Sequence, residues 1–154
     1  MSDQYIQRLR SIRDEFEAAR QAIIFVIGNW DKYDIYKKVE SVTPANFRQA
    51  EQYLSSTYLI RLSAEFEGIL KHHLELNHPS TNIPENPKID WLISAASKSE
   101  NFKADEKLLK DMAKVRDYRN NFVHSGQLPS AIFDFSSALS WFTTFLARLP
   151  EPRR

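Results

Sequence analysis

Two side chains in the last third of the chain, Arg119 and His124, have types and spacing suited to phosphate chemistry. A planar guanidinium clamps phosphate oxygens in a bidentate way, and an imidazole exchanges protons near neutral pH. These are the two groups that a metal-free phosphodiesterase needs. On an ideal helix, side chains five positions apart point about 140° apart. The two groups can therefore approach each other only where the chain leaves helical geometry. We expect this at the helix end near Ser125-Gly126, which would leave the His124 ring free to turn.

Arg119 interrupts an apolar stripe on a predicted helix. Three- and four-residue spacings place it on the same side as Met112, Val115, Phe122 and Val123. An unpaired guanidinium is costly to bury, so Arg119 must pair with a carboxylate, extend to water or face a cleft that an anion can enter. The structural alternative is that Arg119 and His124 form an ion pair or a helix cap, since a histidine in a last turn interacts favourably with the helix dipole.

The elements that must position these residues are predicted to be helices. Three glycines, 42% hydrophobic residues and many strong helix formers favour an all-α fold. Hydrophobic periodicity and capping signals predict helices over residues 3–28, 43–76, 89–97, 105–125 and 129–149. Three prolines predict a loop over 77–88. Residues 30–42 fit a short helix or an ordered connection equally well.

One face of the second predicted helix carries a stripe of core residues. It consists of Leu59, Leu62, Phe66, Ile69, Leu70 and His73. The last predicted helix is dense in aromatic and leucine residues, which indicates deep burial; they are Phe133, Phe135, Leu139, Trp141, Phe142, Phe145 and Leu146. We find no internal repeat or linker, so one domain over 1–154 is expected, with 151–154 as a tail.

Composition excludes several classes of function. The absence of cysteine rules out disulfides, a thiol nucleophile and thiolate zinc sites, and it favours the cytoplasm. No signal peptide and no apolar run near the ~20 residues of a membrane span are found. His72 and His73 point about 100° apart on a helix and cannot chelate together. We therefore expect no metal, no cofactor and no membrane association. The net charge of +1 requires any nucleic-acid contact to be local.

A family resemblance rests on two segments. Residues 119–124 read Arg-Asn-Asn-Phe-Val-His, which resembles the HEPN superfamily signature of an arginine, a polar residue and a histidine four to six positions after the arginine. Residues 58–71 read Tyr-Leu-Ile-Arg-Leu-Ser-Ala-Glu-Phe-Glu-Gly-Ile-Leu-Lys, which resembles the central helix of bacterial HEPN subfamilies. The loop, the short helix and the final helix also follow in the expected order, so the resemblance covers most of 49–149.

The resemblance implies a four-to-five-helix bundle that forms a homodimer around a shared cleft. Many members are metal-independent endoribonucleases, often toxins of toxin–antitoxin pairs or components of phage defence. Here Arg119 would neutralise the scissile phosphate and His124 would act as acid or base, while the RNA 2′-hydroxyl attacks to leave a 2′,3′-cyclic phosphate. Asn120 would orient either group, and Glu67 would position Arg119 or shape the cleft. RNA and an antitoxin or defence-system protein are the implied partners.

Two basic residues beside the motif, Arg116 and Lys114, are candidate contacts to the RNA backbone, although isolated basic residues on helices are usually just solvated. A rival interpretation is a non-catalytic HEPN-like module that binds a partner protein or a nucleotide. A third is a plain helical bundle in which the motif arose by chance. This last alternative predicts Arg119 paired to a carboxylate and far from any interface.

Overall fold

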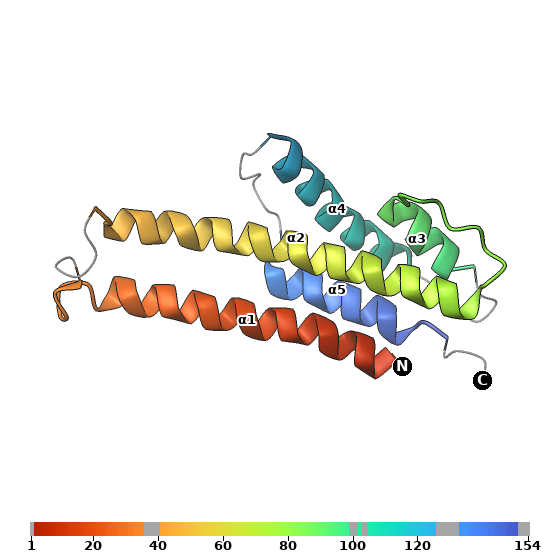
Figure 1. Cartoon of the computed structure of the whole chain (residues 1–154), viewed down its shortest axis with the longest axis horizontal. Helices are drawn as coiled ribbons and strands as arrows, with labels where there is room; N and C mark the ends of the chain where they lie inside the picture. The colour runs from red at the N-terminus through yellow and green to blue at the C-terminus, as the bar shows by residue number, and fades with distance from the viewer. Residues whose placement is uncertain (1, 36–40, 99–101, 103–104, 126–132, 151–154) are drawn as a thin grey trace.

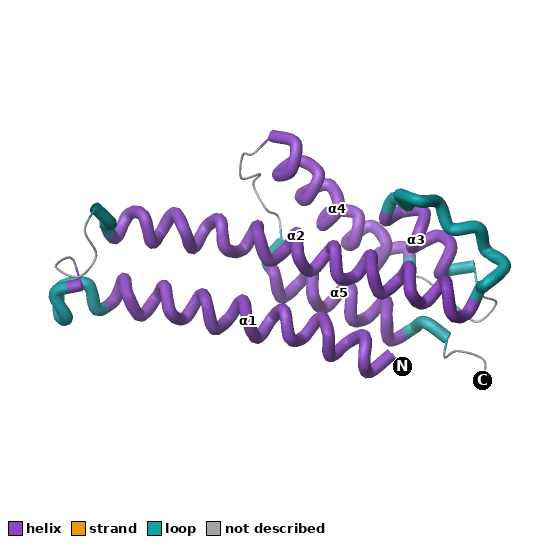
Figure 2. Tube along the Cα trace, in the orientation of Figure 1, coloured by secondary structure: helices purple, strands orange, loops and turns teal. Residues whose placement is uncertain are grey.

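The chain was analysed as a computed structural model that describes residues 2–35, 41–98, 102, 105–125 and 133–150. The described residues form five helices and no strand, which confirms the all-α prediction (Figure 1, Figure 2). The helices are α1 (Ser2–Gly28), α2 (Pro44–Asn77), α3 (Ile89–Ala96), α4 (Glu106–Ser125) and α5 (Phe135–Ala147).

The two longest helices, α1 and α2, lie antiparallel and form a hairpin (Figure 1). Ion pairs tie them together along their length: Arg8 contacts Glu65 at 2.5 Å, and Arg61 contacts Glu15. The start of α2 is fixed by a capping box, in which the side chain of Asn46 accepts a hydrogen bond from the Thr43 backbone N–H at 2.8 Å. The Thr43-Pro44 start signal in the sequence is thus confirmed.

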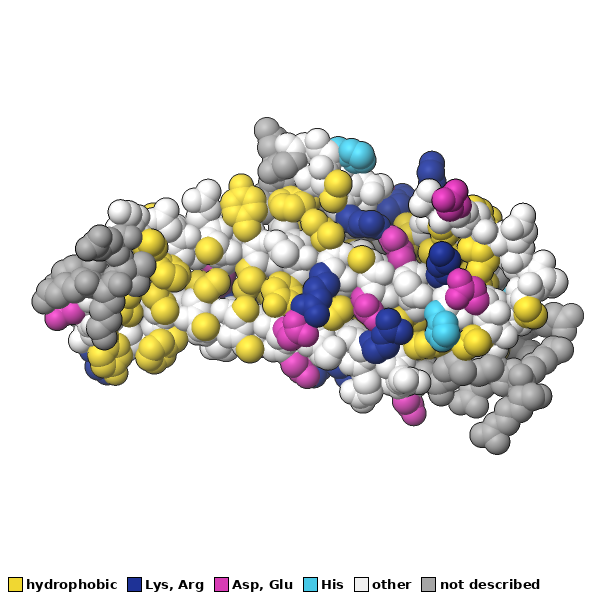
Figure 3. All heavy atoms as spheres, in the orientation of Figure 1, with side chains coloured by type: hydrophobic (Ala, Val, Ile, Leu, Met, Phe, Trp, Pro, Cys, Tyr) yellow, Lys and Arg dark blue, Asp and Glu magenta, His cyan; other side chains and the backbone are white. Residues whose placement is uncertain are grey.

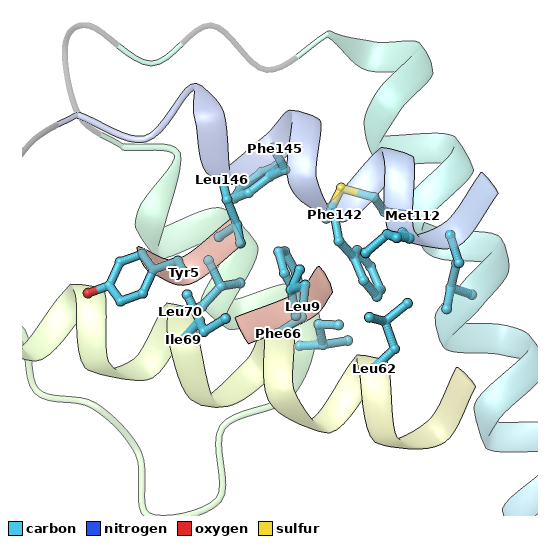
Figure 4. Close-up of a cluster of buried hydrophobic side chains, with 14 of the residues drawn as sticks. Tyr5, Leu9, Leu62, Phe66, Ile69, Leu70, Met112, Phe142, Phe145 and Leu146 are labelled. Carbon is cyan, nitrogen blue, oxygen red and sulfur yellow. The ribbon is translucent and has the colours of Figure 1, made fainter. Parts of the chain in front are cut away.

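The core lies where α5, α4 and α3 pack against the hairpin. At its centre Phe66 of α2 stacks on Phe142 of α5, with ring centroids 4.2 Å apart and planes 5° apart. Figure 4 shows side chains from four helices converging on this point. They are Tyr5 and Leu9 from α1, Leu62, Phe66, Ile69 and Leu70 from α2, Met112 from α4, and Phe142, Phe145 and Leu146 from α5.

The other half of the hairpin contributes no buried residue to this core, although the partly buried Leu54 packs against its edge. No described residue in 17–35 or 41–55 is buried. Figures 1 and 2 show why, because most of this end of α1 and α2 extends past α3, α4 and α5, and only the residues around Tyr53 reach α4. We call these two segments the distal hairpin. A helix pair without a third element leaves much of its surface in water.

The boundaries of the first four helices agree with the prediction to within two residues. The predicted core stripe of α2 is also confirmed, since all six of its members are buried. The loop predicted over 77–88 is confirmed from His78 onward. For residues 30–42 the sequence allowed either a short helix or an ordered connection. Residues 30–34 form turns and Ile35 has 3₁₀ conformation, while residues 36–40 lie outside the described part of the chain.

The predicted start of the last helix was wrong. Phe133 and Asp134 are not helical, and α5 begins at Phe135. Asp134 is the N-cap, because its side chain accepts a hydrogen bond from the Ser137 backbone N–H at 2.7 Å. The predicted start at 129–130 falls outside the described residues. The prediction relied on Pro129 as the start signal, whereas the Asp134 cap sets the start of α5.

The prediction that no segment crosses a membrane was also tested against the helices. Within the described ranges, none of the helices is both long enough and apolar enough to span a bilayer.

Candidate functional site

Arg119 lies on α4 opposite Glu67 of α2. Its Nη1 atom donates a hydrogen bond to the Glu67 carboxylate, and the two side chains form an ion pair. The Arg119 side chain is 30% exposed and that of Glu67 is 22% exposed. Burial raises the pKa of Glu67, while the charge of Arg119 and its hydrogen bond act in the opposite direction. Glu67, the carboxylate that we expected to position Arg119, is thus in direct contact with it.

The register of α4 against α2 is set one residue earlier, at Tyr118. Tyr118 is buried, and its hydroxyl hydrogen-bonds the hydroxyl of Ser56 at 2.7 Å. Sequence reasoning gave Tyr118 no role, although its three-residue spacing from Val115 was a signal that it shares the buried side. The neighbouring Arg119 reaches Glu67, eleven residues further along α2, so the two adjacent side chains of α4 contact separate parts of that helix.

His124 does not lie beside Arg119 in one chain. It is exposed in the last turn of α4, which stays helical through Ser125. The two side chains therefore keep the divergence of about 140° expected from helix geometry. Asn120, four residues before His124, is exposed on the His124 side of the helix. Gly126, where the ring was expected to gain freedom, lies outside the described residues.

The two candidate RNA-backbone contacts already have acidic partners. Arg116 donates to Asp90 of α3 at 2.5 Å and also pairs with Asp117 at 2.7 Å. These hydrogen bonds raise the pKa of Arg116, so it is a firmly charged group held between α3 and α4. Lys114 pairs with Asp111 at 2.6 Å. Like Arg119, Arg116 remains partly exposed (29%) while it is paired to a carboxylate, and the Lys114 side chain is 42% exposed.

The apolar stripe predicted around Arg119 is only partly buried. Met112 and Val115 are buried, but Phe122 is half-buried and Val123 is 58% exposed. The reason is visible in Figure 1, where the C-terminal end of α4 projects away from the bundle. Phe122 instead contacts Tyr53 of α2, with ring centroids 6.4 Å apart, and Tyr53 is itself 40% exposed. Exposed apolar side chains therefore flank Arg119.

A pocket of about 340 Å³ lies between α3 and α4, away from this pair. Ile93, Leu109 and Met112 are among its lining residues, and Arg116 lies at it. Arg119 and His124 do not line it.

The described residues also contain no group of three or more histidine, aspartate or glutamate side chains placed to hold a metal ion. His72 is exposed and His73 is buried, so the two adjacent rings occupy different environments.

Comparisons with known proteins give no identification. No family model matches the chain, and neither a curated protein nor a solved structure matches it. What the protein does must be inferred from its own side chains.

Proposed function

We propose that this protein is a metal-independent endoribonuclease of the HEPN type, whose site combines Arg119 of one copy with His124 of another. The observation that carries the proposal is the state of Arg119. Its guanidinium is paired with Glu67 from another helix, and the Arg119 side chain as a whole is 30% exposed. A held but accessible guanidinium suits the binding of a phosphate, because little conformational freedom is lost when the anion arrives.

A second copy is needed because one α4 helix directs Arg119 and His124 to different sides. Val123 and Tyr53, which are 58% and 40% exposed, offer apolar surface beside Arg119 for a partner to cover. A homodimer formed there would bring the partner's exposed α4 end towards Arg119. It would also place two guanidiniums near one cleft and raise the local potential despite the near-neutral net charge of +1.

The reaction follows from these two groups. Arg119 neutralises the phosphate that is attacked by the neighbouring 2′-hydroxyl. The proton of that hydroxyl passes to a base, the new bond joins the 2′-oxygen to phosphorus, and the bond to the 5′-oxygen breaks as that oxygen takes up a proton. His124 serves as the acid or the base, and Asn120, four residues away on the same helix side, orients it. DNA is not a substrate because it lacks the 2′-hydroxyl.

Such an activity fits a cytoplasmic toxin or phage-defence component held in check by a partner protein. The Arg119–Glu67 pair also fits two other interpretations. A guanidinium matched by a carboxylate that links α2 to α4 is what a plain helical bundle with a chance motif predicts, and it is equally compatible with a non-catalytic module that binds a partner protein or a nucleotide.

The deciding experiment incubates purified protein with mixed RNA in EDTA. We expect cleavage that leaves 2′,3′-cyclic phosphate ends. Arg119→Ala and His124→Ala should each lower the rate by about 100-fold or more. Arg61→Ala and His72→Ala are matched controls, since both residues are exposed on other surfaces, and they should cleave normally. Intact RNA over a range of substrates would favour the binding module.

Mixing the two inactive variants tests the composite site. In a mixed dimer, the Arg119→Ala copy still supplies His124, and the His124→Ala copy still supplies Arg119, so one site contains both original residues. Cleavage should therefore return on mixing and subunit exchange. If both groups came from the same copy, every site in the mixture would lack one of them and no activity would return.

A further inference from the structure

The distal hairpin has a sequence suited to a core but no core to join. Residues 22–27 read Ala-Ile-Ile-Phe-Val-Ile, six consecutive apolar residues. At about 100° per residue such a run covers every side of a helix. α2 can cover one side only, and no described residue in 17–35 or 41–55 is buried.

Two of the large exposed side chains of this region are in contact with each other. Phe25 is 59% exposed, Tyr33 is 47% exposed, and their rings stack with centroids 6.4 Å apart. Ile24, beside Phe25, is 40% exposed. We call these three residues the distal face. Figure 3 shows apolar side chains along this part of the two helices.

The charges near the distal face indicate that a binding partner should present a surface with little net charge. α1 has no charged residue between Arg20 and Asp31. In the facing segment 44–55 of α2 there is one residue of each sign, Arg48 and Glu51, and Glu51 contacts Arg20 at 3.4 Å. Around Tyr33 the chain carries Asp31, Lys32 and Asp34, and Lys32 Nζ lies 5.1 Å from the centre of the Tyr33 ring. Both signs are thus present in similar number, so two copies of this surface can meet without setting an excess of like charges against each other.

We propose that the distal face binds the distal face of a second copy, so that two helical hairpins form a four-helix arrangement. Two antiparallel pairs related by a two-fold axis are a standard way to bury apolar surface that one pair leaves exposed. This contact is separate from the one beside Arg119, and it does not depend on the ribonuclease proposal.

The size of the face sets the strength of the contact. Residues 17–28 span about 18 Å along the helix axis, and two adjacent helices are about 20 Å wide. Two such surfaces give an interface of roughly 700 Å² in total, below the size of stable specific complexes and in the range of weak contacts. The association should therefore be weak and should increase with protein concentration.

Sedimentation velocity over a range of concentrations tests the proposal on the full chain. We expect the unmodified protein to self-associate, and Phe25→Glu to raise the dissociation constant of this contact by more than about tenfold. Leu76→Glu is the matched control, because Leu76 is an exposed apolar residue (49%) at the opposite end of α2, and it should associate as the unmodified protein does. Circular dichroism establishes that each variant is folded.

Three results would overturn the proposal. The unmodified protein could stay monomeric at every concentration, which would assign the face to another occupant. Phe25→Glu could associate normally while Val123→Glu does not, which would place the only contact between copies beside Arg119. Finally, Leu76→Glu could weaken association as strongly as Phe25→Glu, which would mean that the effect is one of added charge alone.

Discussion

The two ends of the α1–α2 hairpin differ sharply although both are rich in apolar residues. Around Phe66, side chains from α5 and α4 close over the hairpin and the phenyl ring is fully buried. Around Phe25, no other helix of the described part of the chain covers the hairpin, and the ring is 59% exposed. Apolar content decides whether a segment can form a core, whereas the number of packed layers decides whether it does.

The largest expected difference comes from truncating one phenylalanine in each region. Phe66→Ala removes a ring stacked on Phe142 and leaves a cavity, which should lower the free energy of unfolding by about 3–5 kcal/mol. Phe25→Ala removes a mostly exposed ring and should change it by less than about 0.5 kcal/mol when the protein is dilute. Urea denaturation of the two variants measures both values. Similar losses of free energy of unfolding in Phe66→Ala and Phe25→Ala would show that the distal hairpin is covered in solution.

An intermediate effect is expected from pH, through a histidine on the core side. His73 is 2% exposed, and burial lowers its pKa to about 4, with the charges of His78 and His72 acting in the same direction. Asn77 donates a hydrogen bond to its Nδ1 at 3.2 Å, while among the described residues its buried Nε2 has no partner. The neutral ring is therefore the form that the fold accepts.

The direction of the pH dependence follows from the two pKa values of His73. The unfolded chain takes up the proton near pH 6.5, but the folded protein does so only near pH 4. The stabilisation is complete above about pH 6.5 and is lost as the pH falls towards about 4. Between about pH 7 and about pH 5 it should decrease by about 2 kcal/mol. Urea denaturation at both pH values measures this change in the free energy of unfolding. The change should be absent in His73→Leu and present in the exposed control His72→Leu.

The smallest effect is expected at the ion pairs. Glu67→Gln removes the charge that faces Arg119, and since both side chains are partly exposed, the loss should be at most about 1 kcal/mol. Glu15→Gln, in the exposed pair with Arg61, should cause no measurable change. Thermal unfolding at low and high salt compares the two variants. A loss at Glu67 as large as that at Phe66 would mean that the pair holds α4 in place.

Local features of the sequence were sufficient to predict the helices. The Thr43-Pro44 signal located the start of α2, and the spacing of Leu62, Phe66 and Ile69 identified its buried side. Both are local properties, because helix hydrogen bonds join residues four apart and a cap lies within the same turn. The same reasoning failed at α5, where the proline signal near 129 was preferred to the Asp134 cap.

The sequence by itself determined that Arg119 and His124 lie on one helix, and that the Arg119 charge must pair with a carboxylate, extend to water or face a cleft. Only the tertiary structure decided that this partner is Glu67, that Tyr118 is buried against Ser56, and that Val123 is left exposed. Those outcomes depend on how α4 crosses α2 and on where α4 leaves the bundle. Contacts between residues more than 50 positions apart are set by the packing of whole helix faces, which no short segment of the chain encodes.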